Sequence, residues 1–413
     1  MRWLIWLAAF AGTAILAYRR YDMLVGVNPT NPLGRGGDFW GFLHAARQIA
    51  AGHSPYNFRH LRQGYGYVYT PLVALILVPF DQAATVHVWH AWTALSIAAI
   101  IVFGALVVSV ETRELRDWRR PLLFGFAMLT GLAFVPTIVD LQNGQTDAFV
   151  LTLLAAAVLV SERGWAATSG VLIALSAVIK TWPGGAVLIM LRRGYVKRRR
   201  AFVGFCLTLA LAPLLAVAVG GGSGFVDWIK ITFDSSSQEL VSSSVTGTTE
   251  LLFSSSNLAR PVFVSTPLRD IATLVLAAWV IGLLVLTLRW ADSFVLSFWH
   301  VVACVVLLLP VSHADYTMYL LPILWIWAAR WLATLRFNGA AFAVAGLLAL
   351  WWLVLSHSSW EGASTVSSLI FVVPFFANLT AVTGSVIGDH HLRIRSTREL
   401  RSSPPANERH AGV

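Results

Sequence analysis

Charged side chains are scarce in this 413-residue chain, at 12% of the residues against 57% hydrophobic residues. A soluble domain carries about a quarter charged residues, so this chain has too few to cover a surface in water. Apolar runs close to the roughly 20 residues that cross a bilayer recur from end to end. The shortage of charge therefore excludes a soluble protein and predicts an all-α, polytopic integral membrane protein.

Cysteine and the common cofactor motifs are also rare or absent. The two cysteines, Cys206 and Cys304, lie within apolar runs, so neither a disulfide nor a metal-ligand pattern is predicted. The sequence has no His-x-x-x-His pair, no phosphate-cradling Gly-rich loop and no Gly-x-Ser-x-Gly elbow. Gly220-Gly-Gly-Ser-Gly224 follows no strand and is interpreted as a hinge. These absences predict an activity that needs no metal ion and no other cofactor.

Lysine is rare as well, since only three of the 30 basic residues are lysines, and arginine supplies most of the net charge of +10. The basic residues gather in two short segments and in the C-terminal tail: 113–120, 192–200 and 389–413. This distribution is typical of charges that orient a membrane protein, not of a nucleic-acid-binding patch. We therefore predict that these three segments are cytoplasmic and that the protein has no nucleic-acid partner.

The apolar runs predict about twelve transmembrane helices in one domain over residues 1–388, followed by a disordered cytoplasmic tail over 389–413. The apolar segment 67–80 has only 14 residues and is predicted to be an interfacial or re-entrant helix. The predicted spans are 3–18, 86–110, 121–138, 147–160, 165–180, 182–191, 201–220, 271–288, 293–310, 316–333, 340–356 and 364–387.

Counting spans from the basic segments places both termini inside and the long loops 19–85 and 221–270 outside. Arg19 and Arg20 are then on the outer side, against the rule that basic residues are enriched in cytoplasmic loops. The Ser-rich loop 221–270 is predicted to be flexible. Polar side chains near the bilayer are costly and usually functional. The predicted outer set comprises Asp38, Asp140, Gln145, Asp147, Lys180, Asp227, His313 and Asp315.

Asp38 opens an amphipathic segment in the first outer loop. Two glycines precede it, and apolar residues follow at helical spacing from Phe39 to Ile49. One interpretation is that Asp38 only caps this helix, because Asp is a favoured N-cap residue. The other is that its carboxylate is a general base within reach of a substrate hydroxyl.

Three further outer turns each allow a structural and a functional interpretation. Gln145 and Asp147 belong either to a Gly-centred turn that caps the next helix or to a set of groups facing a hydroxyl-rich substrate. Lys180 is either a snorkelling lysine or a cation for a phosphate at the bilayer surface. His313 and Asp315 form either a capped helix start or a functional pair.

Taken in order, these motifs resemble glycosyltransferase family 87 of the C-type membrane fold (GT-C), the polyprenyl-phosphate-mannose-dependent mannosyltransferases of actinobacteria. Two departures from the family pattern are Phe42 in place of Tyr and Asp315-Tyr316 in place of a His-His pair. The matching motifs lie within about residues 20–390: Asp38, Gly52-His-Ser-Pro-Tyr56, Tyr69-Thr-Pro-Leu72, Gly144-Gln-Thr-Asp147, Ile179-Lys-Thr-Trp-Pro183, Arg192-Arg193 and Leu309-Pro-Val-Ser-His-Ala-Asp-Tyr316.

The resemblance implies a GT-C-like fold with interfacial helices in the extracytoplasmic first loop. It implies an α-1,2-mannosyltransferase that uses a polyprenyl-phosphate sugar donor and a glycolipid or lipoglycan acceptor at the outer face of the cell membrane. Asp38 would be the general base and Lys180 the donor-phosphate ligand. The expected sugar and acceptor contacts are Tyr56, Tyr69, Gln145, Asp147, His313 and Asp315.

Two alternatives to this function stay open. One is a transporter or flippase for a polyprenyl-linked substrate, which would use the same outer groups for binding only. Such a protein should also carry buried charges midway through its spans, and the sequence has few. The other is the same class of enzyme with an arabinosyl donor.

Overall fold

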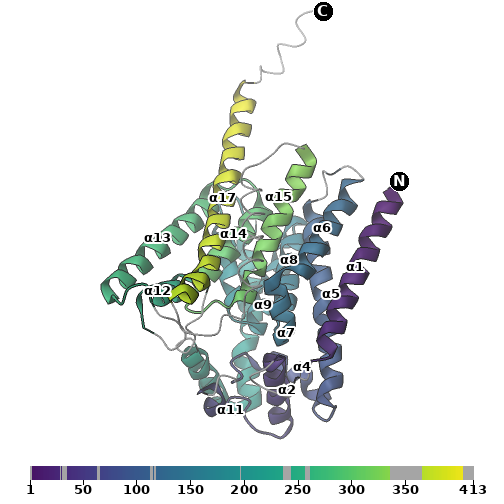
Figure 1. Cartoon of the computed structure of the whole chain (residues 1–413), viewed down its shortest axis with the longest axis vertical. Helices are drawn as coiled ribbons and strands as arrows, with labels where there is room; N and C mark the ends of the chain where they lie inside the picture. The colour runs from purple at the N-terminus through teal and green to yellow at the C-terminus, as the bar shows by residue number, and fades with distance from the viewer. Residues whose placement is uncertain are drawn as a thin grey trace, which may run out of the picture.

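The computed structural model describes residues 2–402, apart from 28, 30–34, 63–65, 112–114, 116–117, 196, 236–242, 256–260 and 335–364. Within these ranges the secondary structure is helical and no strand is present, which confirms the predicted all-α class. The helices form an elongated bundle (Figure 1).

The helices differ widely in length, from the 3 residues of η1 to the 38 residues of α17. Their bounds are α1 Arg2–Val25, α2 Gly37–Ala50, α3 Phe58–Arg62, α4 Pro71–Leu77, η1 Val78–Phe80, α5 Thr85–Glu111, α6 Arg119–Ala133, α7 Val135–Asn143, α8 Asp147–Glu162, α9 Ala166–Ile179, η3 Trp182–Leu191, α10 Arg198–Leu209, α11 Leu211–Ser235, α12 Val245–Phe253, α13 Thr266–Trp290, α14 Phe294–Leu308, η4 Ala314–Tyr319, α15 Leu320–Thr334 and α17 Thr365–Ser402.

Several helices are apolar and long enough to cross a membrane, so the chain is a membrane protein. Among the described residues there are four such helices, or up to five if the pair α6 and α7, bent by 54°, counts as one span. The four lie at Thr85–Val110, Arg198–Phe233, Thr266–Trp290 and Val372–His391. This number is smaller than the predicted twelve, because apolar helices such as α9, η3 and α14 have only 10–17 residues. The predicted span 340–356 lies outside the described residues.

The two ends of the bundle carry different side chains. At one end, the Arg119 guanidinium donates to the carbonyls of Leu332 and Ala333 at the end of α15, at 2.5 and 3.0 Å. The C-terminal end of α17 lies at this end too, whereas α2 and α4 lie at the opposite end (Figure 1). Arg119 therefore lies at the opposite end of the bundle from α2 and α4 of the first loop.

The predicted boundary at residue 388 lies inside a helix, because α17 continues without a break to Ser402. Asp389 is fully buried, and its carboxylate accepts hydrogen bonds from Arg330 at 3.0 Å and from the backbone amide of Asp292 at 2.9 Å. These contacts attach the start of the predicted tail to α15 and to the turn before α14. Residues 403–413 lie outside the described part of the chain.

The segment 221–270 contains more helix than its Ser-rich composition predicts. Residues up to Ser235 continue α11, and α12 follows at Val245–Phe253. The predicted hinge coincides with a kink in α11 at Gly221, where φ is 64° and ψ is −161°. The serines within 236–242 and 256–260 lie outside the described residues.

The first loop is folded onto the bundle by a cluster of aromatic and aliphatic side chains. The buried face of α2 contributes Phe39, Phe42 and Leu43, which pack with Trp89 and Trp92 of α5. The segment predicted as an interfacial helix forms only α4 and η1, and these short helices pack against α2. Burial of large aromatic groups is strongly favourable, so α2 is held in a defined position on the bundle.

Helices α9 and α10 approach closely at glycines, which yields a stability prediction. A Cβ added at Gly170 would lie 1.8 Å from the carbonyl oxygen of Ala201, so these helices cannot accommodate it without moving apart. We expect Gly170→Ala to lower the free energy of unfolding by about 1–3 kcal/mol, the usual effect of overpacking. Thermal unfolding of the solubilised protein measures this change.

Gly282→Ala in α13 is the matched control, because no atom lies within 4 Å of the added Cβ. Alanine is the better helix former by roughly 1 kcal/mol, so this substitution should be neutral or stabilising. Equal melting temperatures for the two variants would contradict the close packing of α9 on α10.

Candidate functional site

Asp38 lies in the first turn of α2, but it does not cap the helix. The N-cap residue is Gly36, whose φ of 78° is left-handed, and no side chain makes a capping hydrogen bond. The Gly36 amide donates to the carbonyl of Gln142 at 2.7 Å, which ties the start of α2 to the end of α7. The Asp38 carboxylate instead accepts a hydrogen bond from Nε2 of Gln145, at 2.8 Å. The capping interpretation of Asp38 is therefore not what the structure shows.

The turn between α7 and α8 brings two of the predicted residues next to α2. Gly144 ends α7 with a φ of 71°, as the Gly-centred turn predicts. A Cβ at this position would lie 2.6 Å from Cβ of Phe39, so glycine allows α2 and the turn to touch. The N-cap of α8 is Thr146, without a side-chain capping bond, and Asp147 does not have that role. The side chains of Gln145 and Asp147 therefore bond to partners from other parts of the chain.

Lys180 directly follows α9 and is the centre of these contacts. Its ammonium donates to Asp147 Oδ2 at 2.5 Å and to Gln145 Oε1 at 3.1 Å, and it lies 3.8 Å from Asp315 Oδ2. The side chain is only 4% exposed. A snorkelling lysine would hold its charge in water, so the buried position favours a specific role for this cation.

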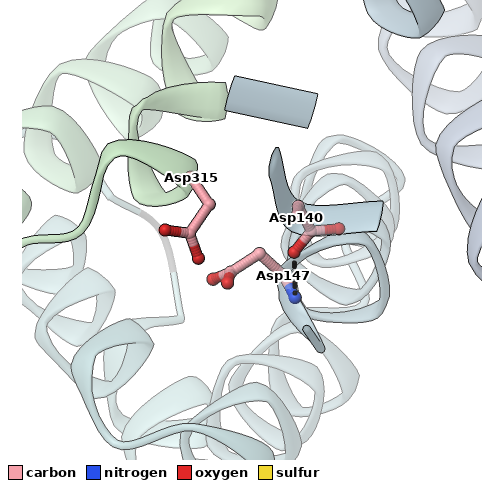
Figure 2. Close-up of side chains that lie close together, drawn as sticks. All are labelled: Asp140, Asp147 and Asp315. Atoms are coloured by element: carbon pink, nitrogen blue, oxygen red, sulfur yellow. Dashed lines mark hydrogen bonds between the residues drawn. The ribbon is translucent and has the colours of Figure 1, made fainter. Parts of the chain in front are cut away.

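Three buried aspartates lie together beside the Lys180 ammonium. One carboxylate oxygen from each of Asp140, Asp147 and Asp315 lies within 4.8 Å of the others. Figure 2 shows the carboxylates of Asp147 and Asp315 turned toward each other, with Asp140 accepting a hydrogen bond from the Asp147 amide at 3.2 Å. Such a group could hold a cation, and the ammonium of Lys180 already contacts two of its members.

Aromatic side chains form a wall beside the charged groups. The Tyr69 hydroxyl donates to Gln145 Oε1 at 2.9 Å, and the Trp182 indole donates to Asp147 Oδ1 at 3.3 Å. The Tyr316 ring stacks on Trp182 and lies 4.1 Å from the Lys180 ammonium. This distance is within the range of a cation–π interaction.

The structure therefore brings together six of the eight predicted site residues: Asp38, Tyr69, Gln145, Asp147, Lys180 and Asp315. The other two predicted residues, Tyr56 and His313, each contact an aromatic residue of the site. The Tyr56 hydroxyl donates to the backbone carbonyl of Tyr69 at 3.1 Å, and the His313 ring packs on Tyr316 at 5.1 Å between centroids.

Asp140, Trp182 and Tyr316 also lie in the site, although only Asp140 belongs to the predicted outer polar set and none of the three was a predicted site residue. Each of the three residues lies within or directly beside one of the motifs that resemble the family. Asp140 immediately precedes Leu141, and Trp182 stands between Lys180 and Pro183.

The environment of Asp38 suits a group that accepts a proton near neutral pH. Burial raises the pKa of its carboxyl to about 6, although the Lys180 charge and the Gln145 hydrogen bond oppose the increase. At pH 7 most of the carboxyl is ionised, yet it is more basic than an ordinary aspartate. A general base works best when its pKa lies near the working pH. The site thus combines a basic carboxylate with a buried ammonium.

Comparison with known proteins identifies the family. The family model of glycosyltransferase family 87 matches residues 67–312, which is more than half of the chain. The matched range includes Tyr69, Gln145, Asp147 and Lys180, and it leaves Asp38 and Asp315 outside. No curated protein matches the sequence. A match of this extent, on a membrane bundle that buries a carboxylate beside an ammonium, shows that the chain belongs to glycosyltransferase family 87 and is a membrane glycosyltransferase.

Proposed function

We propose that this glycosyltransferase transfers mannose, as an α-1,2-mannosyltransferase, from a polyprenyl-phosphate carrier to a hydroxyl of a glycolipid or lipoglycan. The reaction would take place at the outer face of the cytoplasmic membrane. The observation that carries the proposal is the Asp38 carboxylate, which caps nothing and is held by Gln145 beside the buried Lys180 ammonium.

The proposed reaction is one inverting displacement. The acceptor oxygen attacks the anomeric carbon of the sugar and forms the new glycosidic bond. The bond between that carbon and the phosphate oxygen breaks, and polyprenyl phosphate leaves with the electron pair. The acceptor proton passes to Asp38, which acts as general base. The donor is linked to a lipid phosphate, so the site needs no nucleotide-binding fold.

Lys180 is the proposed ligand of the donor phosphate. An ammonium in a buried site stabilises negative charge that develops on a leaving group far better than one in water does. Because Lys180 already lies among the carboxylates of Asp147 and Asp315, the cation that a metal ion would bring is part of the chain. We therefore propose metal-independent transfer.

The remaining predicted residues would contact the sugar and the acceptor. Tyr69, Asp147 and Asp315 lie around Lys180, and His313 and Tyr56 contact Tyr316 and Tyr69, respectively. An aromatic wall beside carboxylates suits a sugar, whose ring has an apolar face and a rim of hydroxyls.

Transfer by the purified protein tests the proposal. Labelled polyprenyl-phosphate mannose and polyprenyl-phosphate arabinose would each be incubated with the protein and a membrane lipid extract, with and without a chelator. We expect labelled glycolipid from the mannose donor, unchanged by the chelator. If only the arabinose donor gives labelled product, the transferred sugar is arabinose and not mannose. Movement of the donor across vesicles without a new glycosidic bond would favour the transporter.

A further inference from the structure

We propose that Gln145 is a positioning residue for Asp38, an amide bridge that orients the carboxylate and couples it to Lys180 and Tyr69. This inference rests on the proposed role of Asp38 as general base. It differs from the role that the sequence motif implies for Gln145, which is direct contact with the sugar or acceptor.

Both polar atoms of the Gln145 side chain have partners within the site. The side chain is buried, with 6% exposure, and Nε2 donates to Asp38 Oδ2 at 2.8 Å. Oε1 accepts from the Tyr69 hydroxyl at 2.9 Å and from the Lys180 ammonium at 3.1 Å. The amide therefore joins three segments that are far apart in the sequence, and a substrate group could donate to Oε1 only by displacing Tyr69 or Lys180.

The direction of the amide follows from the chemistry of its neighbours. An ammonium can only donate hydrogen bonds, and an ionised carboxylate can only accept them. Oε1 must therefore face Lys180, and the NH₂ group must face Asp38. The reversed amide would place N–H groups against the ammonium and an oxygen against the carboxylate, so the arrangement leaves Gln145 a single orientation.

This orientation favours the ionised form of Asp38. Donation from an N–H group stabilises a carboxylate, and an amide whose oxygen accepts from a cation is the stronger donor. The charged and titratable groups around Asp38 are Lys180, Asp147, Asp315 and Tyr69. Lys180 and Gln145 lower the pKa of Asp38, whereas burial and Asp147 raise it. Loss of the bridge should therefore raise this pKa further.

The decisive variant is Gln145→Met, which keeps the length of the side chain and removes its donor and acceptor. The pH dependence of kcat/KM for the acceptor reports the free enzyme's base. We expect the apparent pKa of the acid limb of this profile to rise by about half to one unit, because one charge-assisted hydrogen bond to the base is lost. Activity should then be reduced several-fold more at pH 6 than at pH 8.

Two further variants keep the inference testable. Gln142→Met makes the same substitution three residues earlier, at a side chain outside this network, and should leave the acid limb in place. Tyr69→Phe removes only one donor to Oε1 and should shift the limb in the same direction by a smaller amount. This second shift can be measured even if Gln145→Met does not fold.

The outcomes separate the inference from the proposed function. If Asp38→Asn loses activity while the Gln145 and Tyr69 variants keep the parent's acid limb, Gln145 does not position the base and the inference is wrong. A raised acceptor KM without a shift would make Gln145 a substrate ligand instead. If Asp38→Asn keeps full activity, the proposed function itself fails.

Discussion

Asp38→Asn should fold normally and transfer sugar about 10²–10⁴-fold more slowly than the parent, which is the usual contribution of a positioned general base. Gly36, not Asp38, occupies the N-cap position of α2, so the substitution removes no capping bond. The asparagine carbonyl can still accept the hydrogen bond from Gln145 Nε2. The change therefore removes the basicity and leaves the size and the principal contact intact.

Single-turnover transfer over a range of pH would measure the effect, with size-exclusion profiles and melting temperatures to establish folding. The parent should lose activity as the pH falls through about 6, where burial places the pKa of Asp38, because only the ionised carboxylate accepts the proton. Asp81→Asn is a control, since this carboxylate receives a bond from Gln82 outside the site. A folded Asp38→Asn variant with the parent's rate would reject Asp38 and direct attention to Asp147 or Asp315.

Lys180→Met should impair both folding and donor use, because the lysine neutralises a buried carboxylate. Asp147 is fully buried, and its Oδ2 lies 2.5 Å from the Lys180 ammonium. Removing one partner of a buried ion pair destabilises a protein by about 3–5 kcal/mol. The single variant thus cannot separate a structural lysine from one that binds the donor phosphate.

The double variant Lys180→Met/Asp147→Asn separates these roles. It removes both charges together, so most of the lost stability should return, and the introduced amide can still accept from the Trp182 indole. If Lys180 binds the donor phosphate, the double variant should melt close to the parent and still show at least a ten-fold higher donor KM, the effect of losing about 1.4 kcal/mol of binding. Parent-like donor kinetics in this variant would limit Lys180 to neutralising Asp147.

The local features of the chain follow from its sequence. The apolar runs predict membrane helices, the spacing from Phe39 to Ile49 predicts α2, and Gly144 predicts the turn after α7. These features depend on backbone preferences and on side chains a few residues apart, which a single stretch of sequence contains. The buried face of a helix can likewise be predicted from the spacing of its apolar residues.

The partners of the polar side chains were decided only by the tertiary structure. The bond from Gln145 to Asp38 joins residues 107 positions apart, and Lys180 meets Asp315 from a distant part of the chain. The sequence also predicted a free tail after residue 388, whereas Asp389 is held by Arg330 inside the bundle. A charged side chain has the same local signature in a solvated tail and in a buried pair. Only the packing of distant helices determines which of these it is, because the free energy of burying a charge depends on a partner that local sequence does not specify.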